Sequence, residues 1–389
     1  MKTLFQDGNF YLNHGFVRGD MLVEDGRILE VGSVTGAEEA EICNLEGKTV
    51  VPGFFDIHTH GAVGVDSNGA DADGFEKMCR FFTSQGTTSW LCSILTDTRE
   101  QTLWAIEQYK EWKRRDHAGA SLLGIHLEGP FLCAEYKGAM PEHLLKKPDM
   151  ELLKEYQEAA EGDVRYITVS PEVEGIPEFI PYMKSLGMQV AIGHSGADYD
   201  TAQKAIRNGA MAATHTGNAM KLLHQHYPAI WGAVLEDDDV FCEIICDGRH
   251  LHPGTVRFII KMKGLDKVVA ITDSIMAAGL PDGNYKLGVN DVVVIDGDAK
   301  LAVGGSRAGS TLTTGTALKN VLQYTGRSLQ EIIPMFTENP AKLIGVYDQI
   351  GSLNPGKRAD MLVLDEAYNI EKTYVNGICR YQKEQDPVC

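Results

Sequence analysis

Short apolar runs alternate with segments of helical periodicity between about residues 50 and 280. The apolar runs predict eight strands, at residues 51–57, 87–94, 121–127, 164–169, 188–192, 210–214, 240–246 and 267–271. Amphipathic helices are predicted between them, for example at residues 71–83, 98–115, 176–186 and 199–208. Strands that alternate with helices favour a parallel sheet, and eight such strands are the number that closes a barrel. We therefore predict an α/β fold, a (β/α)8 TIM-type barrel.

Both ends of the chain show a different pattern. Residues 1–50 contain short alternating segments separated by turn signals such as Asp25-Gly26, and residues 350–389 repeat this pattern around the Asn376-Gly377 pair. Neither end is long enough to form a sizeable core alone. We therefore predict one small β-sandwich domain built from residues 1–50 and 350–389, beside a barrel domain of residues 51–349.

Polar residues that can bind metals stand at the ends of five predicted strands. They are His58 and His60, Glu128, His194, His215, and Asp273. The C-terminal ends of barrel strands meet at one rim, and alternate residues of an extended chain, such as His58 and His60, point to the same side. Imidazole and carboxylate ligands from separate strands, with a position left for water, are typical of a catalytic metal site. A single histidine in such a place is more often structural, and we expect this of His126.

Charge and composition narrow the possible partners. The 389 residues include 36 Lys and Arg against 54 Asp and Glu, a net charge of −18, and a surface this acidic repels nucleic-acid phosphates. No stretch is long and apolar enough to span a bilayer, and the first residues lack the apolar core of a signal peptide. Eight scattered cysteines do not suggest a disulfide framework. We expect a cytoplasmic protein with a small-molecule substrate and no nucleic-acid or membrane partner.

Several longer motifs connect these residues to a known family. In chain order they are PGFFDIHTHG, HLEGPF, KGA, GHS, THTGNAM, DGRHLHP, TDS and RAGSTLT. With these motifs the chain resembles the N-acetylglucosamine-6-phosphate deacetylases of the amidohydrolase superfamily over nearly its whole length. The resemblance implies hydrolysis of the N-acetyl amide of an N-acetylhexosamine 6-phosphate, giving acetate and the amino sugar phosphate. The alternatives are N-acetylgalactosamine 6-phosphate, an unphosphorylated N-acetyl amino sugar or another N-acyl compound. A catalytically silent sugar-binding barrel would predict a broken ligand set, whereas this set is complete.

The resemblance also implies individual roles. Glu128, His194 and His215 would hold the principal metal, and His58 and His60 would help to hold a second ion. Zinc is the expected divalent metal, with iron, cobalt or manganese as alternatives and one or two ions per subunit. Asp273 would be the catalytic base, and His250 would help to polarise the carbonyl. The expected substrate contacts are Ala139, Met140, Asn218, Ala219, His226, Asp247, His250, Arg307 and Ala308. The family further implies a homodimer.

Two departures from the family concern the substrate. Met140 stands where the family has a histidine, and His226 stands where it has an arginine that reaches the 6-phosphate from the partner subunit. A neutral imidazole is a weaker phosphate ligand than a guanidinium. Lys221, Arg249 and Arg307 are nearby cations in the sequence, although each could be an ordinary surface charge. Our hypothesis is that an anionic group is still bound, by a rearranged set that includes Arg307 or His226.

Overall fold

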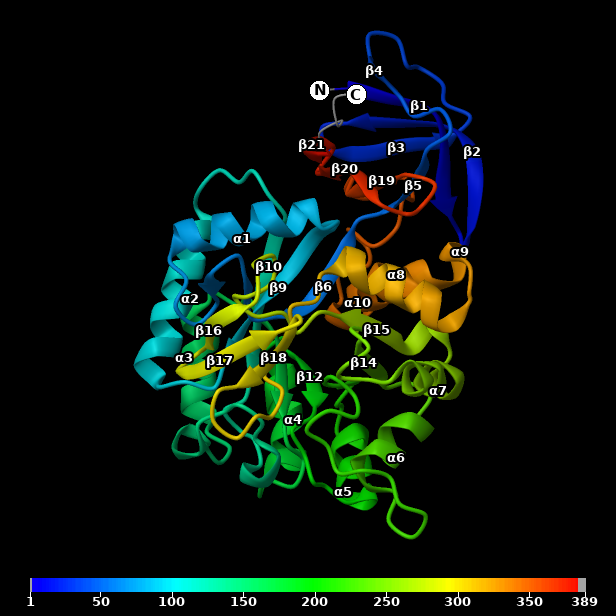
Figure 1. The fold of residues 1–389 in the computed structure, drawn as a ribbon. Helices are drawn as coiled ribbons and strands as arrows, with labels where there is room; N and C mark the ends of the chain where they lie inside the picture. Colours follow the sequence, from blue (N-terminus) through cyan, green and yellow to red (C-terminus); the bar gives the residue numbers. More distant parts are fainter. Residues whose placement is uncertain (1, 384–389) are drawn as a thin grey trace.

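The centre of the fold is a parallel sheet of eight strands in the order β15-β14-β13-β12-β11-β10-β9-β6, with β15 packed beside β6. A computed structural model describes residues 2–383 (Figure 1). The strands are β6 (Phe54–Thr59), β9 (Thr87–Leu95), β10 (Ser121–Glu128), β11 (Val164–Val169), β12 (Gln189–Ile192), β13 (Ala212–Ala213), β14 (Phe241–Ile245) and β15 (Val268–Ile271). Each overlaps one of the eight predicted runs, so the barrel prediction is confirmed.

Helices cover the outside of this sheet (Figure 1). They are α1 (Ala72–Ser84), α2 (Arg99–Lys113), α3 (Met150–Ala159), α4 (Ile176–Ser185), α5 (Tyr199–Arg207), α6 (Ala229–Glu236), α7 (Pro253–Lys263), α8 (Thr314–Thr325), α9 (Leu329–Ile332) and α10 (Glu338–Ile344). Several begin at a residue whose side chain accepts a hydrogen bond from a free backbone N–H of the first turn, as Asp71 does for α1 and Asp198 for α5. The helices bury their apolar faces against the barrel, which forms the largest hydrophobic core.

A separate eight-stranded sheet is assembled from both chain ends, as predicted. Its strands are β1 (Lys2–Leu12), β2 (Gly15–Glu24), β3 (Arg27–Gly32), β4 (Glu41–Asn44), β5 (Thr49–Pro52), β19 (Met361–Leu364), β20 (Ile370–Val375) and β21 (Ile378–Gln382). Figure 1 shows the blue N-terminal and red C-terminal strands side by side above the barrel. Asn376 and Gly377 form the expected turn between β20 and β21, with φ of 53° and 76°. The domain boundaries at residues 50 and 350 stay a prediction, and residues 384–389 lie outside the described part of the chain.

The predicted strand at residues 51–57 divides between the two sheets, because β5 ends at Pro52 and β6 begins at Phe54. Gly53 lies between them, and its N–H donates to the Asp360 carbonyl 2.9 Å away. A Cβ atom at Gly53 would lie 2.1 Å from Oγ1 of Thr88. Only glycine therefore fits where the chain passes from the sandwich into the barrel.

A small antiparallel sheet, absent from our sequence prediction, follows the last barrel strand. It contains β16 (Gly283–Leu287), β17 (Asn290–Ile295) and β18 (Asp298–Leu301). The shortest strands, β7 (Gly61–Ala62) and β8 (Val65–Asp66), form another pair after β6. Leu287 and Val292 of the three-stranded sheet pack in one hydrophobic cluster with Met140 and Ala308. The sheet therefore forms one wall at the open end of the barrel.

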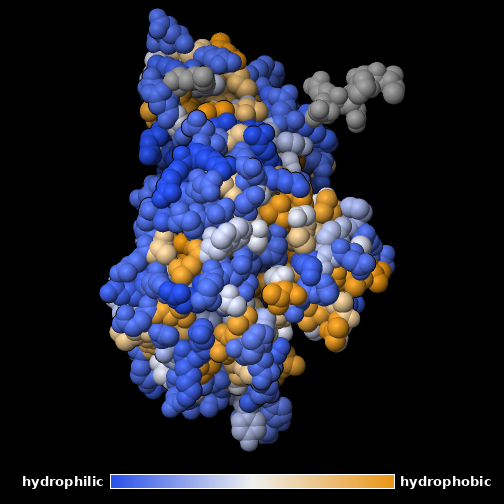
Figure 2. Space-filling model, turned by 90° about the vertical axis from the view of Figure 1, so that its left-hand side faces the viewer, coloured by the Kyte–Doolittle hydropathy of each residue, from blue (hydrophilic) through white to orange (hydrophobic). Residues whose placement is uncertain are grey.

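Figure 2 shows a mostly hydrophilic face whose hydrophobic residues form several small groups. None of the helices within residues 2–383 has the length and apolar character needed to cross a membrane. The seven cysteines of these residues are all free thiols, and Cys389 lies outside them.

Candidate active site

Glu128, His194 and His215 meet at the C-terminal rim of the barrel. Nε2 of His194 and Nε2 of His215 lie 3.0 and 3.2 Å from Oε1 of Glu128, and 3.0 Å from each other. All three side chains are buried. Three ligand atoms this close, one anionic and two from imidazoles, form the kind of pocket that a divalent metal occupies.

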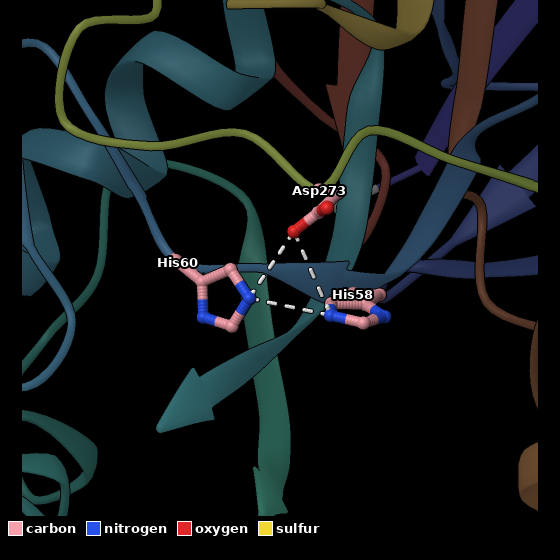
Figure 3. Close-up of side chains that lie close together, drawn as sticks. All are labelled: His58, His60 and Asp273. Carbon is pink, nitrogen blue, oxygen red and sulfur yellow. Dashed lines mark hydrogen bonds and ion pairs between the residues drawn. The ribbon is translucent and has the colours of Figure 1, made fainter. Parts of the chain in front are cut away.

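His58, His60 and Asp273 form a second triad beside the first (Figure 3). Nε2 of His60 lies 3.2 Å from Nε2 of His58 and 3.2 Å from Oδ1 of Asp273. Oδ1 of Asp273 is 3.7 Å from Nε2 of His58. The two histidines point to the same side of β6, as the alternation of a strand requires, and Asp273 reaches them from the end of β15.

Glu128 links the two triads. Its Oε2 lies 3.2 Å from Nε2 of His60, and its Oε1 lies 3.5 Å from Nε2 of His58. A carboxylate that contacts ligand atoms of both triads can bind two ions at once, one in each triad, or a single ion that both triads hold. The geometry therefore accommodates one or two ions.

Backbone carbonyl oxygens fix the far sides of two imidazoles. Nδ1 of His194 lies 2.8 Å from the Tyr136 carbonyl, and Nδ1 of His60 lies 3.1 Å from the Ser93 carbonyl. A carbonyl can only accept, so Nδ1 carries the proton in both rings and the Nε2 lone pair of the neutral ring points inward. This arrangement is typical of histidines that bind a metal. The donor set of both triads thus fits a divalent ion.

The backbone conformation aims three of these side chains. His194, His215 and Asp273 each stand two residues beyond the last residue of β12, β13 or β15, and their φ angles are 47°, 29° and 50°. Left-handed φ is unfavourable for residues with a side chain and persists only where the surroundings enforce it. Each strand therefore ends in the same turn, which directs a ligand toward the barrel axis.

The triads also shift one another's protonation. Burial disfavours the charged form of His60, but Asp273 and Glu128 outweigh burial and raise its pKa to about 9. Burial alone would raise the pKa of Glu128, yet the surrounding histidines hold it well below its usual value. The pKa of Asp273 is likewise lowered by His60 and His58, against the effect of burial. The site therefore stabilises positive charge, as protons on imidazoles or as a cation between them.

Glu243, which our sequence analysis missed, supports both triads from below. It lies in β14 and is fully buried. Its Oε2 is 3.0 Å from Nδ1 of His58 and accepts the backbone N–H of His215 at 3.1 Å, while Tyr166 donates its hydroxyl to Oε1 at 2.5 Å. A lone acidic residue inside the apolar run 240–246 was the signal that could have revealed it.

His126 has the structural position that we expected. Its Nδ1 lies 2.9 Å from the Ser93 hydroxyl and its Nε2 lies 2.9 Å from the Thr168 hydroxyl. Burial, helped by the neighbouring histidines, lowers its pKa well below the ordinary value. A neutral ring with both nitrogens engaged has no atom left for an ion.

A cavity of about 370 Å³ opens above the triads. Seven of the predicted substrate contacts line it: Ala139, Met140, Asn218, Ala219, His250, Arg307 and Ala308. Tyr136 and Leu287 line it as well and were not predicted. The cavity thus brings substrate-sized space, the ligands and Asp273 together.

Asp247, also predicted as a substrate contact, lies behind His250. Its Oδ2 is 2.7 Å from Nδ1 of His250, and its Oδ1 accepts the backbone N–H of His250 at 2.8 Å. Burial opposes ionisation of Asp247, but the bond to His250 lowers its pKa overall. Asp247 therefore orients the ring of His250, whose other edge faces the cavity.

His226 does not reach this cavity within one chain. It is exposed and lines a different hollow, together with Lys221 and Tyr227. Arg249 is also exposed and donates to the Asp296 carbonyl. Among the predicted cations only Arg307 lines the cavity, where it forms a double hydrogen bond with Asp298 at 2.9 and 3.2 Å.

An eight-stranded parallel barrel with histidine and carboxylate ligands at its C-terminal rim is typical of metal-dependent hydrolases. Comparison with known proteins agrees. The profile of the amidohydrolase family matches residues 49–379. N-acetylglucosamine-6-phosphate deacetylase of Bacillus subtilis (strain 168) is 33% identical over 386 residues, which cover 98% of this chain and 96% of that protein.

Two further relatives span most of the chain. N-acetylgalactosamine-6-phosphate deacetylase of Escherichia coli O157:H7 is 32% identical over 336 residues, 86% of this chain and 89% of that protein. The crystal structure of N-acetylglucosamine-6-phosphate deacetylase from Pasteurella multocida superimposes with a TM-score of 0.90 at 31% identity, covering 97% of this chain and 99% of that one. The chain therefore belongs to the N-acetylglucosamine-6-phosphate deacetylase family of amidohydrolases. The family predicted from the motifs is confirmed.

Proposed function

We propose that this chain hydrolyses the N-acetyl amide of an N-acetylhexosamine 6-phosphate, in the first place N-acetylglucosamine 6-phosphate, to acetate and the amino sugar phosphate. The observation that carries the proposal is the position of Asp273, which lines a cavity directly beside two metal-binding triads. The named activities of the relatives from Bacillus subtilis and Pasteurella multocida support the choice of substrate.

Glu128, His194 and His215 would hold the principal divalent ion, and His58, His60 and Asp273 would hold a second one with help from Glu128. When bound, a divalent ion lowers the pKa of water and polarises a carbonyl oxygen. We propose zinc because imidazole and carboxylate ligands at short distances suit it, although iron, cobalt and manganese accept the same donors.

Asp273 would transfer the proton in the reaction. Its Oδ1 is held beside His60 and the residue lines the cavity, so the carboxylate is placed to accept a proton from the attacking water. The protonated carboxyl then delivers this proton to the amide nitrogen, which leaves as an amine. One carboxyl group thereby serves as base and then as acid.

His250 would contact the acetyl carbonyl or a sugar hydroxyl from the side of the cavity. Asp247 fixes its ring through Nδ1, so the opposite edge stays available to the substrate. Asn218, Ala219, Ala139 and Met140 line the rest of the cavity, and we propose that they contact the sugar. Met140 is buried and apolar where the family has a histidine, so it supports packing rather than a hydrogen bond.

The phosphate would be bound by Arg307 at the mouth of the cavity. His226 lies on an exposed loop beside Leu222 and Tyr227, which are 68% and 72% exposed. In a homodimer such a loop could bring His226 to the cavity of the partner. We propose a homodimer on this ground, and a cytoplasmic location because buried free cysteines fit a reducing compartment.

N-acetylgalactosamine 6-phosphate is the second candidate substrate, since a relative with that named activity covers 86% of this chain. A metal analysis and a screen of N-acetylglucosamine and N-acetylgalactosamine, each with and without a 6-phosphate, test the proposal. Release of acetate from a phosphorylated sugar by the metal-loaded protein is expected. Failure to release acetate from all four compounds would contradict it.

A further inference from the structure

Glu243 places a carboxylate in the interior of the barrel, below the metal-binding rim. The whole residue is 0% exposed, and its neighbours along β14 are the buried Cys242 and Ile244. A buried carboxylate is unfavourable unless hydrogen bonds and an opposite charge offset its lost hydration. The hydrogen bonds are present, from Tyr166, His58 and the backbone of His215.

The positive charge that would offset the carboxylate of Glu243 does not come from a nearby lysine or arginine in the described part of the chain. Of the ion pairs within residues 2–383, Glu243 makes one, with Nδ1 of His58, and neither Lys nor Arg takes part. When Nε2 of His58 binds an ion, the ring is neutral and the positive charge lies on the ion. A cation in the triad of His58, His60 and Asp273 would therefore supply the charge that Glu243 needs.

The charge of the ligands leads to the same conclusion. The two triads contain four imidazoles, which are neutral as ligands, and two carboxylates, Glu128 and Asp273. Two negative charges balance one divalent ion, so a second ion would leave a buried excess of positive charge. Glu243 adds one more negative charge directly behind His58.

We propose that Glu243 is a positioning residue that enables the second ion to bind, by fixing His58 and by offsetting the charge of that ion. This inference rests on the proposed metal-dependent function and adds a residue to it. Glu243 reaches the triad of Glu128, His194 and His215 only through one backbone N–H, whereas it contacts the His58 ring directly. Its loss should affect the two ions unequally.

Glu243→Gln separates charge from geometry. A glutamine oxygen can accept from His58 and from the backbone of His215, and its amide group can donate to the Tyr166 oxygen, so all three contacts can be retained. The pair Glu243→Asp and Glu243→Asn provides a second comparison, because these side chains have the same length and differ in charge. Asp360→Asn, a buried carboxylate of the sandwich that pairs with Arg358 at 2.6 Å, is the matched control.

The experiment is a titration of chelator-treated full-length protein with Zn²⁺, with bound metal measured after equilibrium dialysis. Wild type and Asp360→Asn are expected to bind two ions per chain. Glu243→Gln should keep the tighter ion and weaken the second by about 10–100-fold, the usual effect of losing a partner behind a metal-bound histidine. Should Glu243→Gln not fold, Glu243→Asp must still bind the second ion at least about tenfold more tightly than Glu243→Asn.

Unchanged affinity for both ions in Glu243→Gln, or equal affinities in the Asp and Asn pair, would overturn the inference. So would an active wild type that binds a single ion, and the proposed function would then survive. A wild type that binds both ions but releases no acetate would contradict the proposed function and leave the role of Glu243 standing.

Discussion

Oε2 of Glu128 lies 3.2 Å from Nε2 of His60, although Glu128 also forms the core of the triad with His194 and His215. One carboxylate thus belongs to both metal-binding groups. The two groups should respond together when Glu128 changes and separately when any other ligand changes.

Glu128→Gln is expected to lose both ions, because the amide lacks the charge that both groups share. The loss of a residue that hydrogen-bonds to a metal ligand typically lowers metal affinity by about 10–100-fold. The loss of Glu128, itself a ligand, should lower the affinity for each ion by more. His58→Asn, the matched variant, should weaken only the second ion. Metal content after dialysis against buffered Zn²⁺ measures this, and a Glu128→Gln protein that retains one ion at full affinity would show that the groups are independent.

Asp273→Asn should lower kcat by about 10²–10⁴-fold, the contribution expected of a general acid–base group. Asparagine tolerates left-handed φ, and the ion bound by Glu128, His194 and His215 should remain. Acetate release and metal content are measured together. Asp239→Asn, whose side chain is 98% exposed in the parent, is the control with normal activity. If the kcat of Asp273→Asn stayed within tenfold of the wild-type value, Asp273 would not be the residue that transfers the proton.

Arg307→Ala should lower kcat/KM for phosphorylated sugars by about 10–100-fold, since a hydrogen bond to a charged group contributes about 1.5–3 kcal/mol. Activity on an unphosphorylated N-acetyl sugar, if measurable, should not change. Lys300→Ala is the matched control, because Lys300 also pairs with Asp298, at 3.0 Å, without lining the cavity. If kcat/KM fell equally for phosphorylated and unphosphorylated sugars, Arg307 would maintain the shape of the loop and would not bind the phosphate.

Lys357→Met should stabilise the protein at pH 7. Burial lowers the pKa of Lys357 from 10.5 to about 8, and this difference corresponds to about 3 kcal/mol. The ammonium donates to the Ile350 carbonyl and lies over the Tyr347 ring, so we expect a net gain of about 1–2 kcal/mol.

The pH dependence identifies the cause of that gain. Below about pH 8 Lys357 is charged in both states, so the folded state bears the full unfavourable burial of charge. Between about pH 8 and 10.5 the folded state releases its proton before the unfolded state does, and wild-type stability rises with pH. The advantage of Lys357→Met in denaturant titrations should therefore shrink toward pH 10.5, and an advantage that does not change with pH would point to packing instead.

The parts of the structure that follow from periodic patterns were predictable from the sequence. The barrel strands are buried on both faces and appear as apolar runs, and His58 and His60 follow from strand alternation. The division of residues 51–57 at Gly53 was missed because apolar residues stand on both sides, although the pair Pro52-Gly53 is a typical break signal, and the contact with Thr88 requires the glycine.

In the site, residues marked by a local sequence pattern were predictable, and residues whose role depends on partners far away in the sequence were not. Ligands at strand ends converge because barrel topology requires it. Glu243 contacts residues 185 and 77 positions away, His58 and Tyr166, and no local pattern encodes such pairs. The wall formed by β16–β18 was also missed: β17 contains the apolar run 292–295, but β16 and β18 are short, partly exposed and have no such run. The distance between His226 and the cavity likewise depends on how an exposed loop folds.

The left-handed turns at His194, His215 and Asp273 imply a trade-off between activity and robustness. Such a conformation costs about 1–3 kcal/mol per residue, and the surrounding barrel must hold it in place. Substitutions that relax these turns, such as glycine for Asp273, would relieve part of that cost while removing the chemistry. Screens for heat resistance alone would then favour inactive proteins, so attempts to stabilise this enzyme should leave these three strand ends unchanged.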